Sequence, residues 1–311
     1  SVNPTGTIKD RAAWELATLY RDTARGYYLD MRAGNLMRSQ LETKPIPRFV
    51  LVTAGNEGLA IADRFAQHNL PPPKLIIGID TPPERLEVLK KLRADVYMVD
   101  LSQKAFTPEE MLVLTDTKLG VGINATKDSP IIAPHAIFYD WHAHEVFNEK
   151  PDEVYGPYGS GRWMENMLYW QDRTKRNAAS GRRDPRLQVN ATDVTPIAIL
   201  GAQPVQRDSN ADKLTADFKP FLIFDDDDIS GLKALGSTPD ATGVYRTEEE
   251  YIGEAHDILT RPQNGINTEP SGSAGLALLL QRADQGLVNP KKKLLVVNTG
   301  FGIDRPPAKI P

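Results

Sequence analysis

The sequence predicts an α/β fold with two open, mostly parallel, twisted sheets flanked by helices. Two observations predict it: short apolar runs alternate with amphipathic helical stretches, and several of the apolar runs end in loops of small residues. Strand–helix alternation at this spacing is typical of a parallel sheet covered by helices. The length of 311 residues is enough for one large domain or two modest ones.

The first predicted helix begins at Lys9, after a turn at 3–6, because apolar residues recur at helical spacing through Tyr20. A basic segment from about residue 31 to 48 should be a loop or an inserted helix. Predicted strands cover 49–52, 75–79, 96–99, 154–155, 197–200, 221–224 and 294–297. Predicted helices cover 59–67, 83–94, a stretch from about 130 through 146, 163–170 and 269–280. Residues 171–195 are polar and rich in arginine, which predicts a long exposed excursion.

Composition argues against several classes of function. Hydrophobic residues make up 40% and charged residues 25%, as in ordinary globular proteins, and a net charge of −4 argues against a nucleic-acid partner. No apolar run approaches the length of a membrane span. The absence of cysteine rules out disulfides and thiolate metal sites, and it fits a reducing compartment. The five histidines have no spacing typical of a metal site, and the acidic run 225–228 predicts a solvated turn.

Lys9 is the leading candidate for a reactive residue. It stands where the turn meets the first helix, beside backbone N–H groups that have no partner within the helix. Desolvation near the positive end of a helix disfavours the charged form of a lysine, and a neutral amine is nucleophilic. Taken alone, an ordinary surface lysine in a first helical turn explains the local pattern at least as well.

The segment Asn3-Pro4-Thr5-Gly6-Thr7-Ile8-Lys9-Asp10-Arg11 resembles the lysine motif of the tryptophan synthase β-like, or fold type II, family of pyridoxal-phosphate enzymes. That family includes threonine synthase, cysteine synthase and threonine dehydratase. The resemblance implies pyridoxal 5'-phosphate as the cofactor, bound as a Schiff base to Lys9 in a cleft between two domains. It implies a large cofactor-binding domain from 1–48 and 146–311, a smaller mobile domain from 49–145, and a homodimer as the family's habit.

A glycine loop at 156–162 joins a predicted strand to a helix. Such a loop offers backbone N–H groups at a helix N-terminus, which suit a phosphate. Its place matches the family's phosphate loop, and the resemblance implies these residues as phosphate ligands: Gly159, Ser160, Gly161 and Arg162. The sequence departs from the family where Arg162 and Trp163 replace further small residues.

The loop 53–58 follows another predicted strand and resembles the family's asparagine loop. The resemblance implies that Asn56 contacts the ring hydroxyl of the cofactor. It also implies these substrate-binding residues around the substrate carboxylate: Thr53, Ala54, Gly55 and Asn56. Backbone N–H groups favour an anion, and an amide side chain can hold a ring in place. Glu57 is unexpected beside a carboxylate site, and we expect its side chain to point away; the alternative is an additional acid–base group.

Residues 298–306 resemble the C-terminal motif of threonine synthase. The resemblance implies that the Thr299 hydroxyl contacts the pyridine nitrogen, and a neutral partner there favours elimination and replacement over transamination. Residues 269–273 resemble the segment that precedes the last strand in the family, and we also expect Ser271 to be a helix N-cap.

The predicted function is that of a lyase or transferase, similar to threonine synthase or cysteine synthase, that performs β- or γ-elimination or replacement on an amino acid. Lys9 would also be the general base for the α-proton, and the cofactor would supply the electron sink. The alternatives are a serine or threonine dehydratase, and a diverged non-catalytic member that acts as a binding or scaffold subunit. We expect an amino-acid substrate, no metal, no nucleic-acid or membrane partner, and a cytoplasmic location, or an organelle stroma or matrix if a targeting segment was removed.

Overall fold

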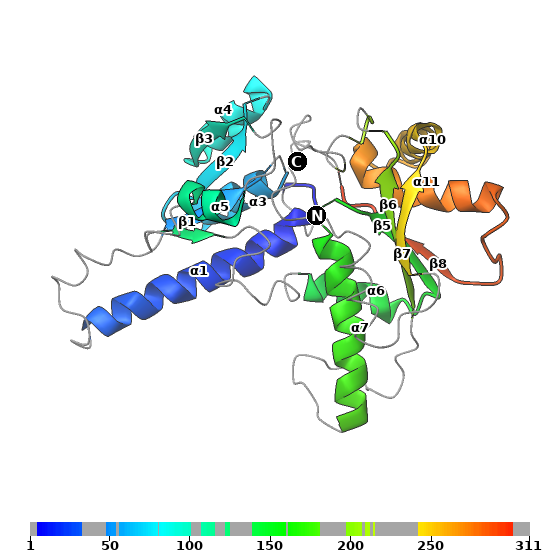
Figure 1. Ribbon diagram of the computed structural model, residues 1–311, viewed down its shortest axis with the longest axis horizontal. Coiled ribbons are helices and arrows are strands. Elements are labelled where there is room, and N and C mark those ends of the chain that lie inside the picture. The colour runs from blue at the N-terminus through cyan, green and yellow to red at the C-terminus, as the bar shows by residue number, and fades with distance from the viewer. Residues whose placement is uncertain are drawn as a thin grey trace. The chain divides into compact units, whose positions relative to one another are not determined.

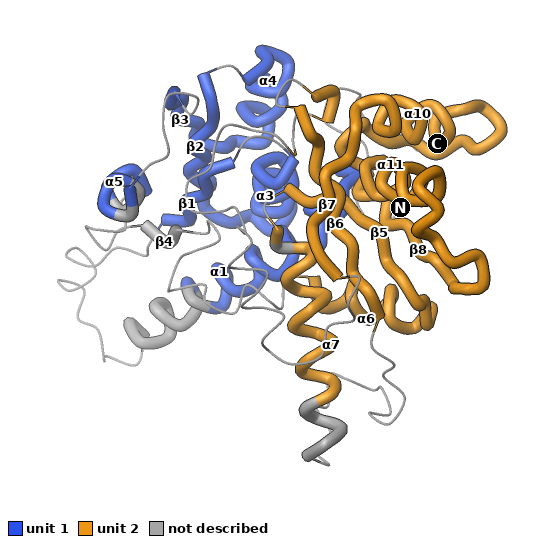
Figure 2. Tube along the Cα trace, turned by 45° about the vertical axis from the view of Figure 1, so that its right-hand side comes forward, with its two compact units in different colours: residues 1–134, 216–222, 302–311 blue, residues 135–215, 223–301 orange. Residues whose placement is uncertain are grey.

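The computed structural model (Figure 1) describes residues 5–32, 48–53, 56–79, 81–100, 107–115, 122–124, 139–159, 161–180, 197–206, 209–211, 214 and 242–300. Described residues up to 124 belong to one compact unit and those from 139 onward to another, coloured blue and orange in Figure 2. We call them the first unit and the second unit. The domain bounds expected from the sequence, and the mobility of 49–145, stay predictions. The strand expected at 221–224 and the acidic turn at 225–228 lie outside the described residues.

The first unit contains a parallel sheet with the described strands in the order β3-β2-β1-β4. The strands are β1 (Arg48–Val52), β2 (Lys74–Gly78), β3 (Asp95–Val99) and β4 (Gly122–Asn124). The helices are α1 (Lys9–Arg32), α3 (Asn56–Gln67), α4 (Pro83–Lys91) and α5 (Pro108–Leu114). The sequence predictions for the strands β1 to β3 and for α1, α3 and α4 are confirmed to within a few residues. β4 and α5 were not predicted.

Both faces of this sheet are covered. Alternate residues of a strand point to opposite faces, and Val50 and Val52 of β1 form a buried cluster with Ile76 on one face. Phe49 therefore points to the other face, where its ring centroid lies 5.9 Å from that of Tyr20 on α1 and 4.8 Å from that of Phe65 on α3. This buried aromatic group packs α1 and α3 against the same face of the sheet.

The second unit contains a parallel sheet with the described strands in the order β7-β6-β5-β8. The strands are β5 (Glu153–Pro157), β6 (Ala198–Pro204), β7 (Gly243–Thr247) and β8 (Leu294–Val296). The helices are α6 (Asp140–Asn148), α7 (Arg162–Ser180), α10 (Glu249–Thr260) and α11 (Pro270–Asp284). The sequence predicted all of these except β7 and α10.

Helices also cover both faces of the second sheet. Leu200 and Ala202 of β6 cluster with Ala274 and Leu278 of α11 on one face. Between them, Gly201 points to the opposite face, where a Cβ would lie 3.3 Å from the sulfur of Met164 on α7. The sheet is therefore sandwiched between α11 and α7.

α7 corrects the prediction of an exposed excursion for residues 171–180, because the helix continues to Ser180; residues 181–195 lie outside the described residues. Gln171 and Thr174 are buried. The Gln171 side-chain oxygen accepts a 2.8 Å hydrogen bond from the Ile197 backbone N–H, and the Thr174 hydroxyl donates to the Trp170 carbonyl at 2.7 Å. Polar residues thus continue the buried stripe of the helix because their hydrogen bonds are satisfied inside the unit.

The two sheets have the same topology. In each, the first strand of the unit lies between the second and the fourth, so the chain switches sides at β1/β4 and at β5/β8. In open parallel sheets, ligands bind beyond the carboxyl ends of the strands at such switch points. The topology therefore directs attention to the loops that follow β1, β5 and β8.

Candidate functional site

The loops singled out in the sequence follow these strands. Residues 53–58 follow β1, residues 158–161 follow β5, and residues 297–300 follow β8. The described candidates in the first unit are Lys9, Thr53 and Asn56, and those in the second unit are Gly159, Gly161 and Thr299. Ala54, Gly55, Ser160 and the side chain of Arg162 lie outside the described residues.

Lys9 is the first residue of α1, and the preceding turn fixes it there. Gly6 has a φ of 80°, a conformation that glycine adopts readily. The Thr7 hydroxyl accepts a 3.2 Å hydrogen bond from the Lys9 backbone N–H, and the buried Asp10 carboxylate accepts 2.9 Å bonds from both the N–H and the hydroxyl of Thr5. Burial raises the pKa of Asp10, although the bonds from Thr5 oppose that shift. These hydrogen bonds hold the backbone of the turn and thus fix the position of the Lys9 Cα.

The ammonium nitrogen of Lys9 lies 3.8 Å from Oε2 of Glu57, and the two side chains are 27% and 14% exposed. The Glu57 side chain thus points to Lys9; whether it points away from the substrate-carboxylate site expected at 53–56 stays a prediction, since residues 54 and 55 lie outside the described residues. Glu57 is the second residue of α3, and α3 packs beside α1. The packing of these two helices brings the start of α3 to the start of α1, and the Glu57 carboxylate to the lysine. Asn56, the first residue of α3, lies directly before it.

Thr53 contributes less to an anion site than the sequence suggested. Its backbone N–H donates a 3.0 Å hydrogen bond to the Ile76 carbonyl of β2, and its methyl group lies 2.7 Å from where a Cβ on Gly58 would be. The residue is buried. The N–H of Thr53 is thus used by the sheet and is not available to a substrate carboxylate.

The glycine loop of the second unit leads into the N-terminus of α7. Gly161 has a φ of 73°, and its carbonyl accepts a 2.9 Å helical hydrogen bond from the Glu165 N–H. The Trp163 ring is buried against Gly156, where a Cβ would lie 2.5 Å from a ring carbon. The tryptophan that replaces a small residue thus packs inward against β5. The backbone N–H groups at the start of this 19-residue helix form the kind of site that binds phosphate.

The loop after β8 is held by the side chain of Asn298. Its oxygen accepts hydrogen bonds of 2.8 Å from the Thr268 hydroxyl and 2.9 Å from the Gly300 N–H. Thr299 donates its N–H to the Gly272 carbonyl at 3.4 Å, and a Cβ on Gly272 would lie 2.4 Å from the Gly300 carbonyl oxygen. Thr299 is therefore placed directly beside the N-terminus of α11.

Ser271 corrects a second prediction, because Glu269 occupies the N-cap position of α11 and Ser271 lies inside the first turn. The Ser271 side chain is buried, and its hydroxyl has no hydrogen-bond partner among the described residues. An unsatisfied buried hydroxyl costs free energy, so a polar ligand group beside it would be favoured. The Ser271 hydroxyl therefore marks a position in the second unit where a polar atom of a cofactor would be stabilised.

These groups fit pyridoxal phosphate. An aldehyde requires an amine that a ligand can reach, and Lys9 is partly exposed. A phosphate dianion suits the start of α7, and a heteroaromatic ring nitrogen suits a hydroxyl donor such as Thr299 or Ser271. The described residues include no cluster of three or more histidine, cysteine or acidic side chains that could hold a metal ion. No helix in the described part of the chain is long and apolar enough to cross a membrane.

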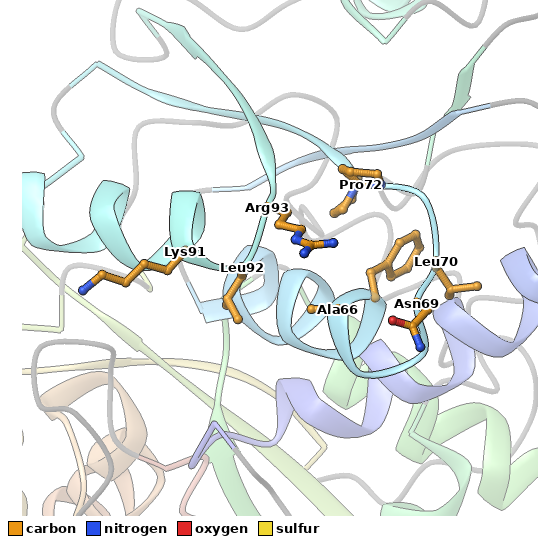
Figure 3. Close-up of a pocket in the computed structure, with 9 residues that line it drawn as sticks. Ala66, Asn69, Leu70, Pro72, Lys91, Leu92 and Arg93 are labelled. Carbon is orange, nitrogen blue, oxygen red and sulfur yellow. The ribbon is translucent and has the colours of Figure 1, made fainter.

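A cavity of about 360 Å³ opens in the first unit at the other end of α3 (Figure 3). Its lining comprises Phe65, Ala66, Asn69, Leu70, Pro72, Pro73, Lys91, Leu92 and Arg93. In Figure 3 the Arg93 guanidinium turns toward Ala66 and Pro72, whereas Lys91 extends away. The cavity lies where α3 and α4 end, and carbonyl groups at helix C-termini attract cations such as Arg93 and repel anions. Its lining residue Ala66 lies ten residues after Asn56 on α3, about 15 Å along the helix axis, so the cavity is separate from the candidate site.

Neither a protein-family model nor the sequence of a curated protein matches the chain. Solved structures are similar to it. O-ureido-L-serine synthase aligns with a TM-score of 0.60 and 16% identity over 96% of this chain and 82% of that chain. A pyridoxal 5'-phosphate-dependent aspartate racemase aligns at 0.59 and 14% over 96% and 82%. The processed form of threonine deaminase isoform 2 from Solanum lycopersicum aligns at 0.59 and 15% over 96% and 72%. The chain therefore has the fold of the fold type II pyridoxal-phosphate enzymes, as its motifs predicted.

Proposed function

We propose that the chain is a pyridoxal-phosphate-dependent enzyme that catalyses elimination or replacement at the β- or γ-carbon of an amino acid. The observation that carries the proposal is the position of Lys9, a partly exposed amine at the start of α1, beside the helix that follows the loop after β1. The likeness to a pyridoxal 5'-phosphate-dependent racemase and to a synthase supports the cofactor and this class of chemistry.

Each candidate residue has a proposed task. Lys9 binds the aldehyde carbon, the 159–162 loop at the start of α7 binds the phosphate, and Asn56 contacts the ring hydroxyl. Thr299 donates its hydroxyl to the ring nitrogen. The bound cofactor supplies an electron sink for the negative charge that develops at the substrate Cα. The Lys9 amine, when released, is the proposed base for the α-proton.

The proposed reaction class depends on a neutral group at the ring nitrogen, and the proposed substrate class depends on the groups around the substrate carboxylate. A hydroxyl at the ring nitrogen, proposed for Thr299, leaves that nitrogen largely unprotonated and favours loss of a leaving group over transamination. The Thr53 hydroxyl and the backbone of 54–56 are the proposed ligands of the substrate carboxylate. A reaction similar to that of threonine synthase or cysteine synthase is the preferred assignment.

The test is the absorbance spectrum of the purified chain with pyridoxal phosphate, before and after borohydride, for the wild type and Lys9→Ala. We expect a visible band that borohydride removes and that Lys9→Ala lacks, with catalysis lost in the variant. Lys91→Ala is the matched control, since Lys91 is exposed and lies at the end of α4. An unchanged band in Lys9→Ala, or no band in the wild type, would contradict the proposal.

Substrate assignment requires a separate screen with phosphohomoserine, acetylserine, serine and threonine. Spectral change and product release with the first two would support replacement. Release of ammonia and a keto acid from serine or threonine alone would instead identify a dehydratase.

A further inference from the structure

The Lys9–Glu57 pair joins the N-termini of two helices. Lys9 opens α1 and Glu57 lies in the first turn of α3, with 3.8 Å between Nζ and Oε2. The positive end of a helix favours a carboxylate in its first turn and disfavours an ammonium. The start of α3 therefore stabilises the charged form of Glu57, whereas the start of α1 destabilises the charged form of Lys9.

The Glu57 carboxylate also favours the charged form of Lys9. Partial burial and the start of α1 both favour the neutral amine, but an opposite charge within about 4–6 Å typically shifts a pKa by 1–3 units toward the charged form. A helix terminus has a smaller effect, about 0.3–1 kcal/mol. The carboxylate therefore has the larger influence, and it opposes what the rest of the site would do to the lysine.

We propose that Glu57 is a positioning residue that holds Lys9 in its ammonium form, directed toward the first turn of α3, in the cofactor-free chain. Nucleophilic attack requires the neutral amine, so Glu57 restrains Lys9 until the pair is broken. This inference rests on the proposed function in treating Lys9 as the reactive amine.

Other charged residues belong to the first turns of α1 and to α3: Asp10, Arg11 and Glu15 on α1, and Asp63 and Arg64 on α3. Asp10 is held by Thr5, and Arg64 lies over the Trp14 ring with its guanidinium carbon 5.0 Å from the centroid. Asp63 and Arg64 are about two helical turns from Glu57, roughly 9–10 Å along α3, so each acts on Lys9 much more weakly than Glu57 does.

The experiment measures the reactivity of Lys9 in the cofactor-free protein. Wild type, Glu57→Gln, Glu57→Asp and Asp63→Asn are pulse-labelled with an amine-acylating reagent between about pH 6 and 10. In this range, below the ordinary lysine pKa of about 10.4, the neutral fraction of the amine rises about tenfold per pH unit. Mass spectrometry of the Lys9 peptide gives the rate, with exposed Lys91 as the internal reference. We expect about tenfold faster labelling of Lys9 at pH 8 in Glu57→Gln, from a shift of about one pKa unit.

The controls distinguish charge from structure. Asp63→Asn removes a carboxylate from the same helix and should leave Lys9 labelling unchanged, and Glu57→Asp keeps the charge and should fall between wild type and Glu57→Gln. Labelling of Lys9 in a folded Glu57→Gln within twofold of wild type would overturn the inference; if that variant does not fold, equal labelling in Glu57→Asp and wild type would do so. A cofactor adduct on Lys9 with no effect of Glu57 refutes only this inference, whereas a clear effect of Glu57 with no adduct refutes only the proposed function.

Discussion

Two lysine–glutamate pairs, one in each unit, differ in geometry and in surroundings. In the second unit, Lys292 Nζ lies 2.7 Å from Oε1 of Glu153, and the Tyr155 hydroxyl donates a 2.6 Å hydrogen bond to Oε2. The Glu153 side chain is 4% exposed and begins β5, at the amino edge of the sheet. In the first unit, Lys9 and Glu57 are 3.8 Å apart at the carboxyl edge.

The difference separates a pair that stabilises the fold from a pair that we propose must be broken before Lys9 reacts. Burial alone would raise the pKa of Glu153, but the hydrogen bonds from Lys292 and Tyr155 bring it below its ordinary value. Burial, together with the bond to Glu153, raises the pKa of Tyr155 to about 12. Both oxygens of Glu153 are thus satisfied, whereas the distance between Lys9 and Glu57 exceeds that of a hydrogen bond.

The largest expected effect on stability is that of Glu153→Ala. The change leaves the buried Tyr155 hydroxyl without its acceptor and Lys292 without its partner, and we expect a loss of about 3 kcal/mol in the free energy of unfolding. Glu149→Ala is the matched control, since Glu149 pairs with Lys293 at 3.2 Å with both side chains more than half exposed, and it should cost less than about 0.5 kcal/mol. Urea unfolding checks both; equal losses would remove the distinction between the two kinds of pair.

A smaller effect on the free energy of unfolding is expected from Gly275→Ala. This variant tests whether the close packing of α11 on β5 leaves no room for a methyl group. A Cβ on Gly275 would lie 2.8 Å from the Tyr155 carbonyl oxygen and 2.9 Å from the Gly156 Cα. Because backbone cannot easily move aside, we expect a loss of about 2 kcal/mol. Gly253→Ala, in α10, meets nothing within 4 Å and should gain roughly 0.5–1 kcal/mol. Calorimetry that shows a gain for both would indicate that α11 can shift.

The smallest effect is a difference in pH dependence between the units. Because the folded pKa of Glu153 lies below its ordinary 4.5, its contribution is present above that value and is lost as the pH falls through the folded pKa. Burial raises the pKa of Asp10 above 3.8, so its contribution falls as the pH rises through that range. Urea unfolding from pH 3 to 6 should show about 1 kcal/mol less loss in acid for Glu153→Gln than for wild type. An identical acid slope in the two proteins would contradict this account of Glu153.

The fold near the site could be predicted because its signals are local. The apolar runs at 49–52, 75–79 and 294–297 form strands, and the small-residue loops follow their carboxyl ends. The start of α1 at Lys9 is equally local, since apolar residues recur from Ala13 to Tyr20. β7 was missed because only Val244 and Tyr245 among its residues are large and apolar, so no apolar run marks it.

The side-chain arrangement of the site could be predicted only in part. The direction of Glu57 depends on the packing of α1 and α3 through Tyr20, Phe49 and Phe65. Lys292 and Glu153 are 139 positions apart in the chain. For Ser271, a signal was present: Pro270 favours the first position of a helix, which places the N-cap at Glu269 and the serine inside the first turn.

The central claim is that Lys9, among all lysines of the chain, bonds to the aldehyde of pyridoxal phosphate. The most direct measurement is to reduce the chain with borohydride in the presence of the cofactor, digest it, and find the modified lysine by mass spectrometry. We predict a phosphopyridoxyl group on Lys9 at close to one per chain, and its loss in Lys9→Ala. The same group spread over exposed lysines such as Lys90 and Lys91, or its persistence in Lys9→Ala, would contradict the claim.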